Sequence, residues 1–191
     1  MRYYLANFSV FILILIASKA FSNEMTLNEL FFDESKPYHI KMLDALPDSA
    51  IIQIGPDDAK NTVIEFMDYF CGYCKKIHPE LIELATRRDD TRVVFLQHPI
   101  LSQSSEVIAA MVVAANTQGK GKELHNALFE ISGSLNQEKL NKIIDDLDIN
   151  KNKLMIDIGR DEIKNIVKLS SFLAMGSGAR GTPSLFINEE F

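Results

Sequence analysis

The 191-residue sequence contains no tryptophan, two cysteines, nine glycines and six prolines. Two cysteines are too few for a disulfide-rich mini-protein, and the low glycine and proline content excludes a collagen-like chain. Basic residues are in the minority, because 20 Lys and Arg stand against 26 Asp and Glu for a net charge of -6. No excess of positive charge is available to neutralise phosphates, so we expect no nucleic-acid partner. With 47% hydrophobic residues, the chain is long enough for a globular domain with its own core.

Long apolar runs are also missing, since none reaches the roughly 20 residues that a transmembrane helix needs. The longest run, residues 8–17, follows Arg2 and precedes small residues at positions 18–22. This order is typical of a signal peptide with its cleavage site. We expect residues 1–22 to be a cleaved export signal, with an uncleaved anchor as the alternative. The mature protein is then expected in the periplasm, without stable membrane insertion.

The two cysteines, Cys71 and Cys74, stand three residues apart in the sequence C-G-Y-C. A disulfide between them closes too short a loop to stabilise the fold much. The remaining interpretations are a metal half-site and a redox pair. A zinc site needs four ligands, and neither a second cysteine pair nor a paired histidine spacing is present. We expect no metal and no cofactor, although His78, four residues after Cys74, leaves a weak Cys/His site open.

The residues around the pair favour redox chemistry. Residues 62–68 are rich in β-branched and apolar side chains, which predicts a buried parallel strand, and residues 74–88 have helical apolar spacing. Cys71 lies between them, where the amino end of a helix stabilises a thiolate and lowers a cysteine pKa. Cys74 lies one turn inside and is more shielded. The pattern therefore predicts that Cys71 attacks and Cys74 resolves the mixed disulfide.

Two other positions extend the predicted site. Glu65 interrupts the apolar strand, and a buried carboxyl there would have a raised pKa and could exchange a proton with the inner thiol. The alternative is a Glu65 that faces water at the strand end. Farther along, residues 184–188 predict a short strand entered through Thr182-Pro183, and an X-Pro bond can be cis.

These motifs together resemble the thioredoxin-fold disulfide oxidoreductases of the DsbA type, over about residues 51–188. The resemblance is carried by residues 63–75 with C-G-Y-C, by Pro79, by His98-Pro99-Ile100-Leu101 and by Gly181-Thr182-Pro183. It implies an α/β fold, in which a thioredoxin-like βαβ sheet receives an inserted helical domain. The family also adds a closing strand and helix after the strand at 184–188, which we expect to be missing here.

The resemblance also implies roles for individual residues. Cys71 is the expected nucleophile, Cys74 the resolving cysteine and Glu65 the buried acid. Pro183 is the expected cis-proline beside the active-site sulfur, and the main chain at Thr182 pairs with an extended substrate. Gly72 and Tyr73 lie between the cysteines, where they tune the thiolate and complete the expected substrate-binding surface.

The predicted organisation has four parts: the signal at 1–22, a helical leader at 23–50, a thioredoxin-like domain at 51–98 and 174–191, and a helical domain at 99–173. Strands are expected over 51–54, 62–68, 92–97 and 184–188. In the helical domain we expect a helix over 107–115, a second that starts at a capping box of Ser134 and Gln137, and one long helix over 155–173. The charged cluster at 120–123 is interpreted as solvated surface.

The predicted function is an exported thiol-disulfide oxidoreductase that forms disulfides in secreted proteins. Two alternatives remain open: a disulfide isomerase or reductase, which C-G-Y-C with Thr182 before Pro183 resembles, and an inactive peptide-binding module. The expected partners are reduced or misfolded exported proteins and a membrane redox partner, either a quinone-linked oxidase or a reductant.

Overall fold

The computed structural model describes residues 35–188, which belong to one compact unit that begins at Glu34. The predicted signal and the first part of the predicted leader, residues 23–34, lie outside the described residues. In chain order the described elements are α3 (Tyr38–Asp44), the 3-10 helix η1 (Asp48–Ala50), β1 (Ile52–Ile54), β2 (Asn61–Met67), α4 (Gly72–Arg87), β3 (Thr91–Gln97), α5 (Gln103–Asn116), α6 (Gly121–Glu130), α7 (Gln137–Asp146), α8 (Lys151–Asp157), α9 (Asp161–Gly176) and β4 (Ser184–Ile187).

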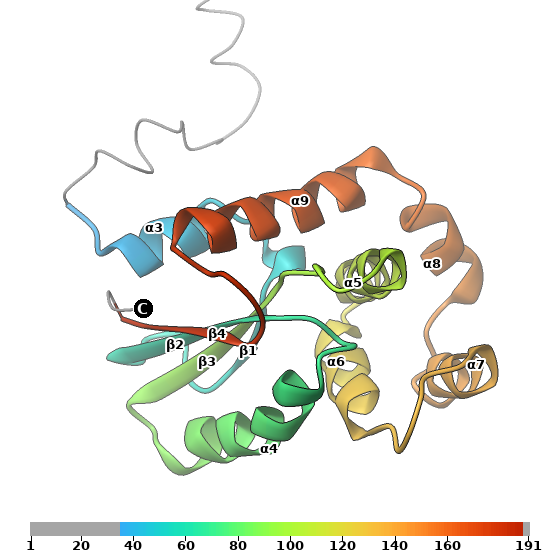
Figure 1. Ribbon diagram of the computed structural model, residues 1–191, viewed down its shortest axis with the longest axis horizontal. Coiled ribbons are helices and arrows are strands. Elements are labelled where there is room, and N and C mark those ends of the chain that lie inside the picture. The colour runs from blue at the N-terminus through green and yellow to red at the C-terminus, as the bar shows by residue number, and fades with distance from the viewer. Residues whose placement is uncertain (1–34, 189–191) are drawn as a thin grey trace, which may run out of the picture. The chain divides into compact units, whose positions relative to one another are not determined.

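A four-stranded sheet in the order β1-β3-β2-β4 organises the fold (Figure 1). β2 and β3 are parallel and joined through α4, which confirms the predicted βαβ unit. β1 pairs with β3 and β4 with β2, both antiparallel. Within residues 35–188 no further strand lies along the outer side of β4. The predicted strands therefore all form, each within one residue of its expected start.

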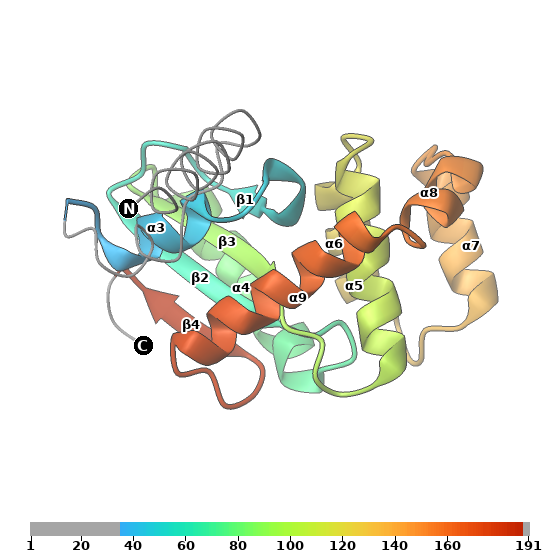
Figure 2. The same cartoon turned by 90° about the horizontal axis from the view of Figure 1, so that it is seen from above.

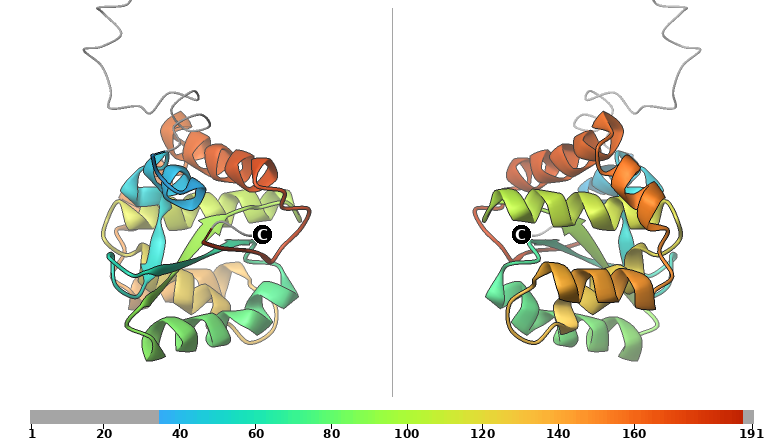
Figure 3. Two further views of the ribbon diagram at one scale, coloured as in Figure 1. Left: turned by 90° about the vertical axis from the view of Figure 1, so that its left-hand side faces the viewer. Right: turned by 90° about the vertical axis from the view of Figure 1, so that its right-hand side faces the viewer.

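Helices cover both faces of the sheet. α4 lies on one face, and α3 and α9 lie on the other (Figures 1 and 3). α5 to α8 gather to one side of the strands (Figure 2). Six of the seven residues of β2 are buried, which explains the nearly continuous apolar sequence of this central strand. The sheet contributes the largest fully buried aromatic side chains, Phe66 and Phe95.

The single helix expected over residues 155–173 is wrong, because α8 ends at Asp157 and α9 begins at Asp161. Gly159 lies in the break and has a low helix propensity. The buried Asp157 carboxylate pairs with Arg160 at 3.1 Å and with Lys153, and these ion pairs hold the turn. α9 also packs on the sheet, since the Ser170 hydroxyl donates to the Gln97 carbonyl at 2.7 Å.

Two further expectations about the helices need correction. The cap of α7 is Asn136, whose side chain accepts from the Lys139 N–H at 2.9 Å, and not Ser134. Lys122 and Glu123 of the charged cluster are exposed, as expected, but they lie in the first turn of a helix, α6, that the sequence did not predict. The buried face of α6 includes Leu124, His125, Leu128 and Phe129.

Candidate active site

Cys71 lies where the segment after β2 turns into α4. It is the N-cap residue of α4, and its Sγ accepts from the Cys74 N–H at 3.4 Å. Its thiol also donates to the Thr182 carbonyl at 3.2 Å, which joins two segments more than a hundred residues apart. The helix begins at Gly72, two residues earlier than expected. The backbone therefore places the Cys71 sulfur at the positive end of a helix and beside the entry to β4.

The two thiols lie in different environments. Cys71 keeps 6% of its surface exposed, whereas Cys74 is fully buried; both are free. Burial raises the pKa of the Cys74 thiol well above its usual range, and a backbone hydrogen bond from the Asp68 segment offsets only part of the rise. At neutral pH Cys74 is therefore a protonated thiol, shielded behind Cys71.

Glu65 is a fully buried carboxyl at the centre of the sheet. In the strand register it lies between Phe95 of β3 and Leu185 of β4, and among the described residues neither of its oxygens has a hydrogen-bond partner. This burial raises the pKa of Glu65 to about 8. The Cys74 thiol nearby stabilises the carboxylate and offsets part of this rise. The alternative of a Glu65 that faces water is wrong.

Thr182 and Pro183 come to the same edge of the sheet because β4 runs antiparallel to β2, with Ser184 opposite Phe66. The Thr182–Pro183 peptide bond is cis. Of the predicted substrate-facing residues, Tyr73 is 74% exposed, and a side chain at Gly72 would meet no atom within 4 Å. The structure thus brings all seven predicted site residues to one region, where they surround the Cys71 sulfur or lie behind it.

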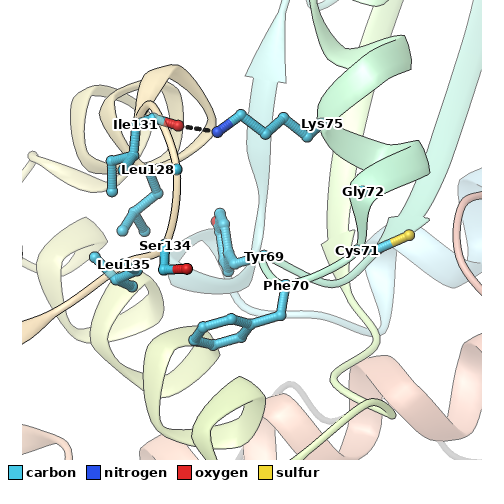
Figure 4. Close-up of a pocket in the computed structure, with 10 residues that line it drawn as sticks. Tyr69, Phe70, Cys71, Gly72, Lys75, Leu128, Ile131, Ser134 and Leu135 are labelled. Carbon is cyan, nitrogen blue, oxygen red and sulfur yellow. Dashed lines mark hydrogen bonds between the residues drawn. The ribbon is translucent and has the colours of Figure 1, made fainter.

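A pocket of about 400 Å³ lies beside Cys71, between the start of α4 and the segment from α6 to α7. Figure 4 shows the Lys75 ammonium reaching the Ile131 carbonyl across this pocket, while the Cys71 sulfur points away from it. Its lining includes Tyr69, Phe70, Leu128 and Leu135. The sulfur therefore faces the Thr182 carbonyl at the entry to β4, and not the pocket.

Asp68 was not singled out by the sequence, yet its buried carboxylate organises the segment before Cys71. Oδ1 accepts from the Phe70 N–H at 2.8 Å, and Oδ2 accepts from the N–H groups of Ile100 and Leu101 at 3.0 Å each. Because β2 and β3 are parallel neighbours, the segments that follow them meet at one edge. Asp68 fastens these segments together.

A polar and aromatic cluster behind Cys74 was also missed. The Tyr69 hydroxyl contacts His125 Nδ1 at 2.9 Å and lies 3.4 Å from Gln97 Nε2. His78 stacks on Phe129 at 4.5 Å, and burial lowers its pKa to about 4. Within residues 35–188 no three His, Cys, Asp or Glu side chains group in a way that could hold a metal ion. The position of His78 among aromatic rings suits a neutral core side chain.

The family model of the DsbA-like thioredoxin domain matches residues 62–191. The chain belongs to the DsbA-like thioredoxin family. The match begins at β2 and includes C-G-Y-C, Pro183 and the whole helical segment, so the site described above lies within the family domain.

Solved structures of this family share the thioredoxin-like fold. A thioredoxin-like oxidoreductase from Silicibacter pomeroyi DSS-3 is 27% identical with a TM-score of 0.68, over 86% of this chain and 87% of that chain. The catalytic domain of Proteus mirabilis ScsC is 25% identical with a TM-score of 0.65, over 78% and 83%. The thiol-disulfide exchange protein α-DsbA2 from Wolbachia pipientis, at 23% identity and a TM-score of 0.65 over 85% and 81%, shows the fold alone.

Curated relatives place a similar segment inside larger proteins. The Na(+)/H(+) antiporter NhaA of Nitrosospira multiformis is 31% identical over 141 residues, which are 71% of this chain and 22% of that protein. NhaA 1 of Salinispora arenicola is 28% identical over 138 residues, or 70% and 21%. The chain spans about a fifth of the length of these relatives. None of the helices in the described part of the chain is long and apolar enough to cross a membrane.

Proposed function

We propose that the protein is an exported thiol-disulfide oxidoreductase that forms disulfides in secreted proteins. The observation that carries the proposal is the asymmetry of the cysteine pair. Cys71 caps a helix and reaches the Thr182 carbonyl, whereas Cys74 is buried one turn behind it. Exchange through a mixed disulfide requires one thiol that substrate can reach and a second that resolves the intermediate from inside.

In the oxidising direction, a substrate thiolate attacks the Cys71 sulfur of the Cys71–Cys74 disulfide. The sulfur–sulfur bond breaks, and Cys74 leaves as a thiolate. A second substrate thiolate then attacks the substrate sulfur of the mixed disulfide and releases Cys71. The substrate loses two electrons and two protons, and the protein disulfide gains two electrons and becomes a dithiol.

Glu65 has the properties of the proton donor for this step. The Cys74 thiolate is formed in a site whose burial favours the thiol. The Glu65 carboxyl nearby is itself held in its protonated form by burial, because its pKa is raised to about 8. A proton that passes from Glu65 to Cys74 stabilises the leaving group, and one that returns in the reverse reaction activates it.

The substrate surface is formed by Gly72, Tyr73, Thr182 and Pro183. The main chain at Thr182 lies beside the sulfur, and the space above Gly72 is open. An extended substrate segment can therefore approach the sulfur along the entry to β4. Recognition mainly through the backbone gives little sequence specificity, which suits many exported substrates.

The trapping experiment uses both cysteine variants with a reduced two-cysteine peptide and an insulin-type disulfide. We expect Cys71→Ser to abolish exchange, and Cys74→Ser to accumulate mixed disulfides that reducing agent releases. If the two variants trap substrate equally, the roles of the cysteines are wrong. If the unsubstituted protein exchanges with neither probe, the chain is a peptide-binding module and not an enzyme.

The direction of exchange decides the redox partner. We propose oxidation, with a membrane quinone-linked oxidase that restores the Cys71–Cys74 disulfide. Faster recovery of scrambled ribonuclease than oxidation of a reduced peptide would instead support an isomerase that is kept reduced by a membrane reductant. Export to the periplasm is tested by N-terminal sequencing of the protein from that compartment, which is expected to begin near residue 23.

A further inference from the structure

A groove runs between α5, α9 and the segment that follows β3, and it belongs to no part of the redox pair. It encloses about 730 Å³ and is lined by residues 98–100, by Glu106 and Ala110 of α5, and by one side of α9. This volume falls within the range of sites that bind ligands the size of a short peptide segment. The groove is therefore large enough for several side chains of a partner.

One edge of the groove belongs to a segment that is tied to the redox site. Its wall at Ile100 is held by the Asp68 carboxylate, which also binds the Phe70 N–H next to Cys71. The residue before Cys71 and the edge of the groove are thus fastened to the same carboxylate, and they lie on neighbouring parts of the protein.

Exposed apolar side chains line the groove and the segments beside it. Phe70 and Leu101 belong to the two chain segments that Asp68 joins, and Ile100, Phe172 and Met175 line the groove itself. All five are at least 41% exposed. Single exposed apolar residues need no explanation, but a contiguous patch beside a cavity is typical of a binding surface.

The charges of the groove differ from those of the chain. Two lysines of α9, Lys164 and Lys168, line it one helical turn apart, against one acid, Glu106. Lys164 lies 3.9 Å from Asp161 and donates to the Gly159 carbonyl at 2.8 Å. Lys168 is exposed and has no acid within ion-pair distance among residues 35–188. Lys168 therefore offers the groove a positive charge without an ion-pair partner among the described residues, in a protein whose net charge is -6.

We propose that this groove binds a segment of the unfolded substrate polypeptide that carries apolar side chains and an acidic side chain, a few residues from the cysteine under attack. The proposal rests on the proposed oxidoreductase function and names a substrate class for it. The apolar residues contact Ile100, Phe172 and Met175, and the carboxylate lies near Lys168.

The experiment measures the second-order rate constant at which the Cys71–Cys74 disulfide form oxidises reduced two-cysteine peptides. The peptides carry three apolar residues followed by Glu, three apolar residues followed by Lys, or a Ser-rich flank, on either side of the cysteines. We expect the Glu peptide to react about fivefold faster than the Lys peptide from at least one side, with a smaller difference in high salt.

Matched variants separate the groove from general effects of charge and hydrophobicity. Lys168→Glu should abolish the preference for Glu, while Lys122→Glu on α6 changes the net charge equally and should keep it. Phe172→Ser should slow both apolar peptides toward the Ser-rich peptide, while Ile156→Ser on α8, which removes another exposed apolar side chain, should not.

Dithiothreitol provides the reaction that needs no groove. If the disulfide form oxidises dithiothreitol but treats all peptides alike, or if the preference survives Lys168→Glu, the groove proposal is overturned and the proposed function stands. If dithiothreitol is not oxidised either, the proposed function fails instead.

Discussion

Replacement of Glu65 by Gln is expected to stabilise the protein at neutral pH. The carboxyl ionises with a pKa of about 8 in the folded chain, against an ordinary value of 4.5. Since the pKa is higher in the folded state, the unfolded chain loses this proton at a lower pH than the folded chain does. The stability that protonated Glu65 contributes is therefore complete below pH 4.5 and is lost as the pH rises toward 8. Each pH unit in that window costs about 1.4 kcal/mol, which gives about 3 kcal/mol between pH 4.5 and pH 7.

The assay is urea unfolding of the reduced protein at pH 4, 5.5, 7 and 8, with Glu65→Gln measured beside it. A Gln side chain has nearly the same shape and does not ionise, so the loss of stability with pH should disappear. We expect equal free energies of unfolding at pH 4 and an advantage of about 3 kcal/mol for Glu65→Gln at pH 7. Glu123→Gln, at an exposed position of α6, is the control and should show no such change.

A difference between Glu65→Gln and the unsubstituted protein that stays constant from pH 4 to pH 8 would refute this reasoning, because only ionisation makes the effect depend on pH. The same variant should slow thiol exchange if Glu65 supplies the proton to Cys74. A gain in stability together with a loss of exchange is the combined result expected of a carboxyl that serves chemistry at the expense of the fold.

Two other substitutions test the surroundings of the site, and a pair of glycine substitutions tests the turn after β1. Asp68→Asn should lower the free energy of unfolding by about 2 kcal/mol in urea unfolding, because the amide faces backbone N–H groups that the carboxylate accepted; unchanged stability would contradict the role of Asp68 as a fastener. Tyr69→Phe should lower the free energy of unfolding by about 2 kcal/mol, because it leaves His125 Nδ1 buried without its hydrogen-bond partner. An unchanged free energy of unfolding would mean that this contact does not stabilise the fold. Gly55→Ala should lower the free energy of unfolding by more than about 2 kcal/mol, since the residue has a φ of 98° and a Cβ there would lie 2.5 Å from a backbone oxygen of β3. Gly176→Ala is the control, because a Cβ there meets no atom within 4 Å. This control should change the thermal midpoint little or raise it.

The sheet could be predicted from the sequence because buried strands have a local signature. Six of the seven β2 residues are buried, so β-branched and apolar side chains follow one another with Glu65 as the one interruption, and a change to helical spacing marks the start of α4. The position of Cys71 between the two could be predicted for the same reason.

The helical segment was harder to predict because apolar spacing does not show every break between helices. The intervals from Met155 to Leu173 stay helical across the turn at Gly159, although α8 ends at Asp157 and α9 begins only at Asp161. α6 was missed because its first turn is charged, and only its later residues face the core. Spacing alone cannot separate one curved helix from two helices whose apolar faces meet the same core.

The polar contacts around the site depend on tertiary structure, and Glu65 and Asp68 show why. Both are acids near the end of β2 and both are buried. Asp68 accepts three backbone N–H groups, two of them from a segment some thirty residues away. Among the described residues Glu65 accepts none and lies between two apolar neighbours. A carboxylate that satisfies backbone donors stabilises the fold, whereas an unpaired carboxyl weakens it at neutral pH, as the proposed proton donor to Cys74 does. The hydrogen-bond partners, and not the residue type or its spacing, therefore distinguish Asp68, which holds the backbone, from Glu65, the proposed proton donor.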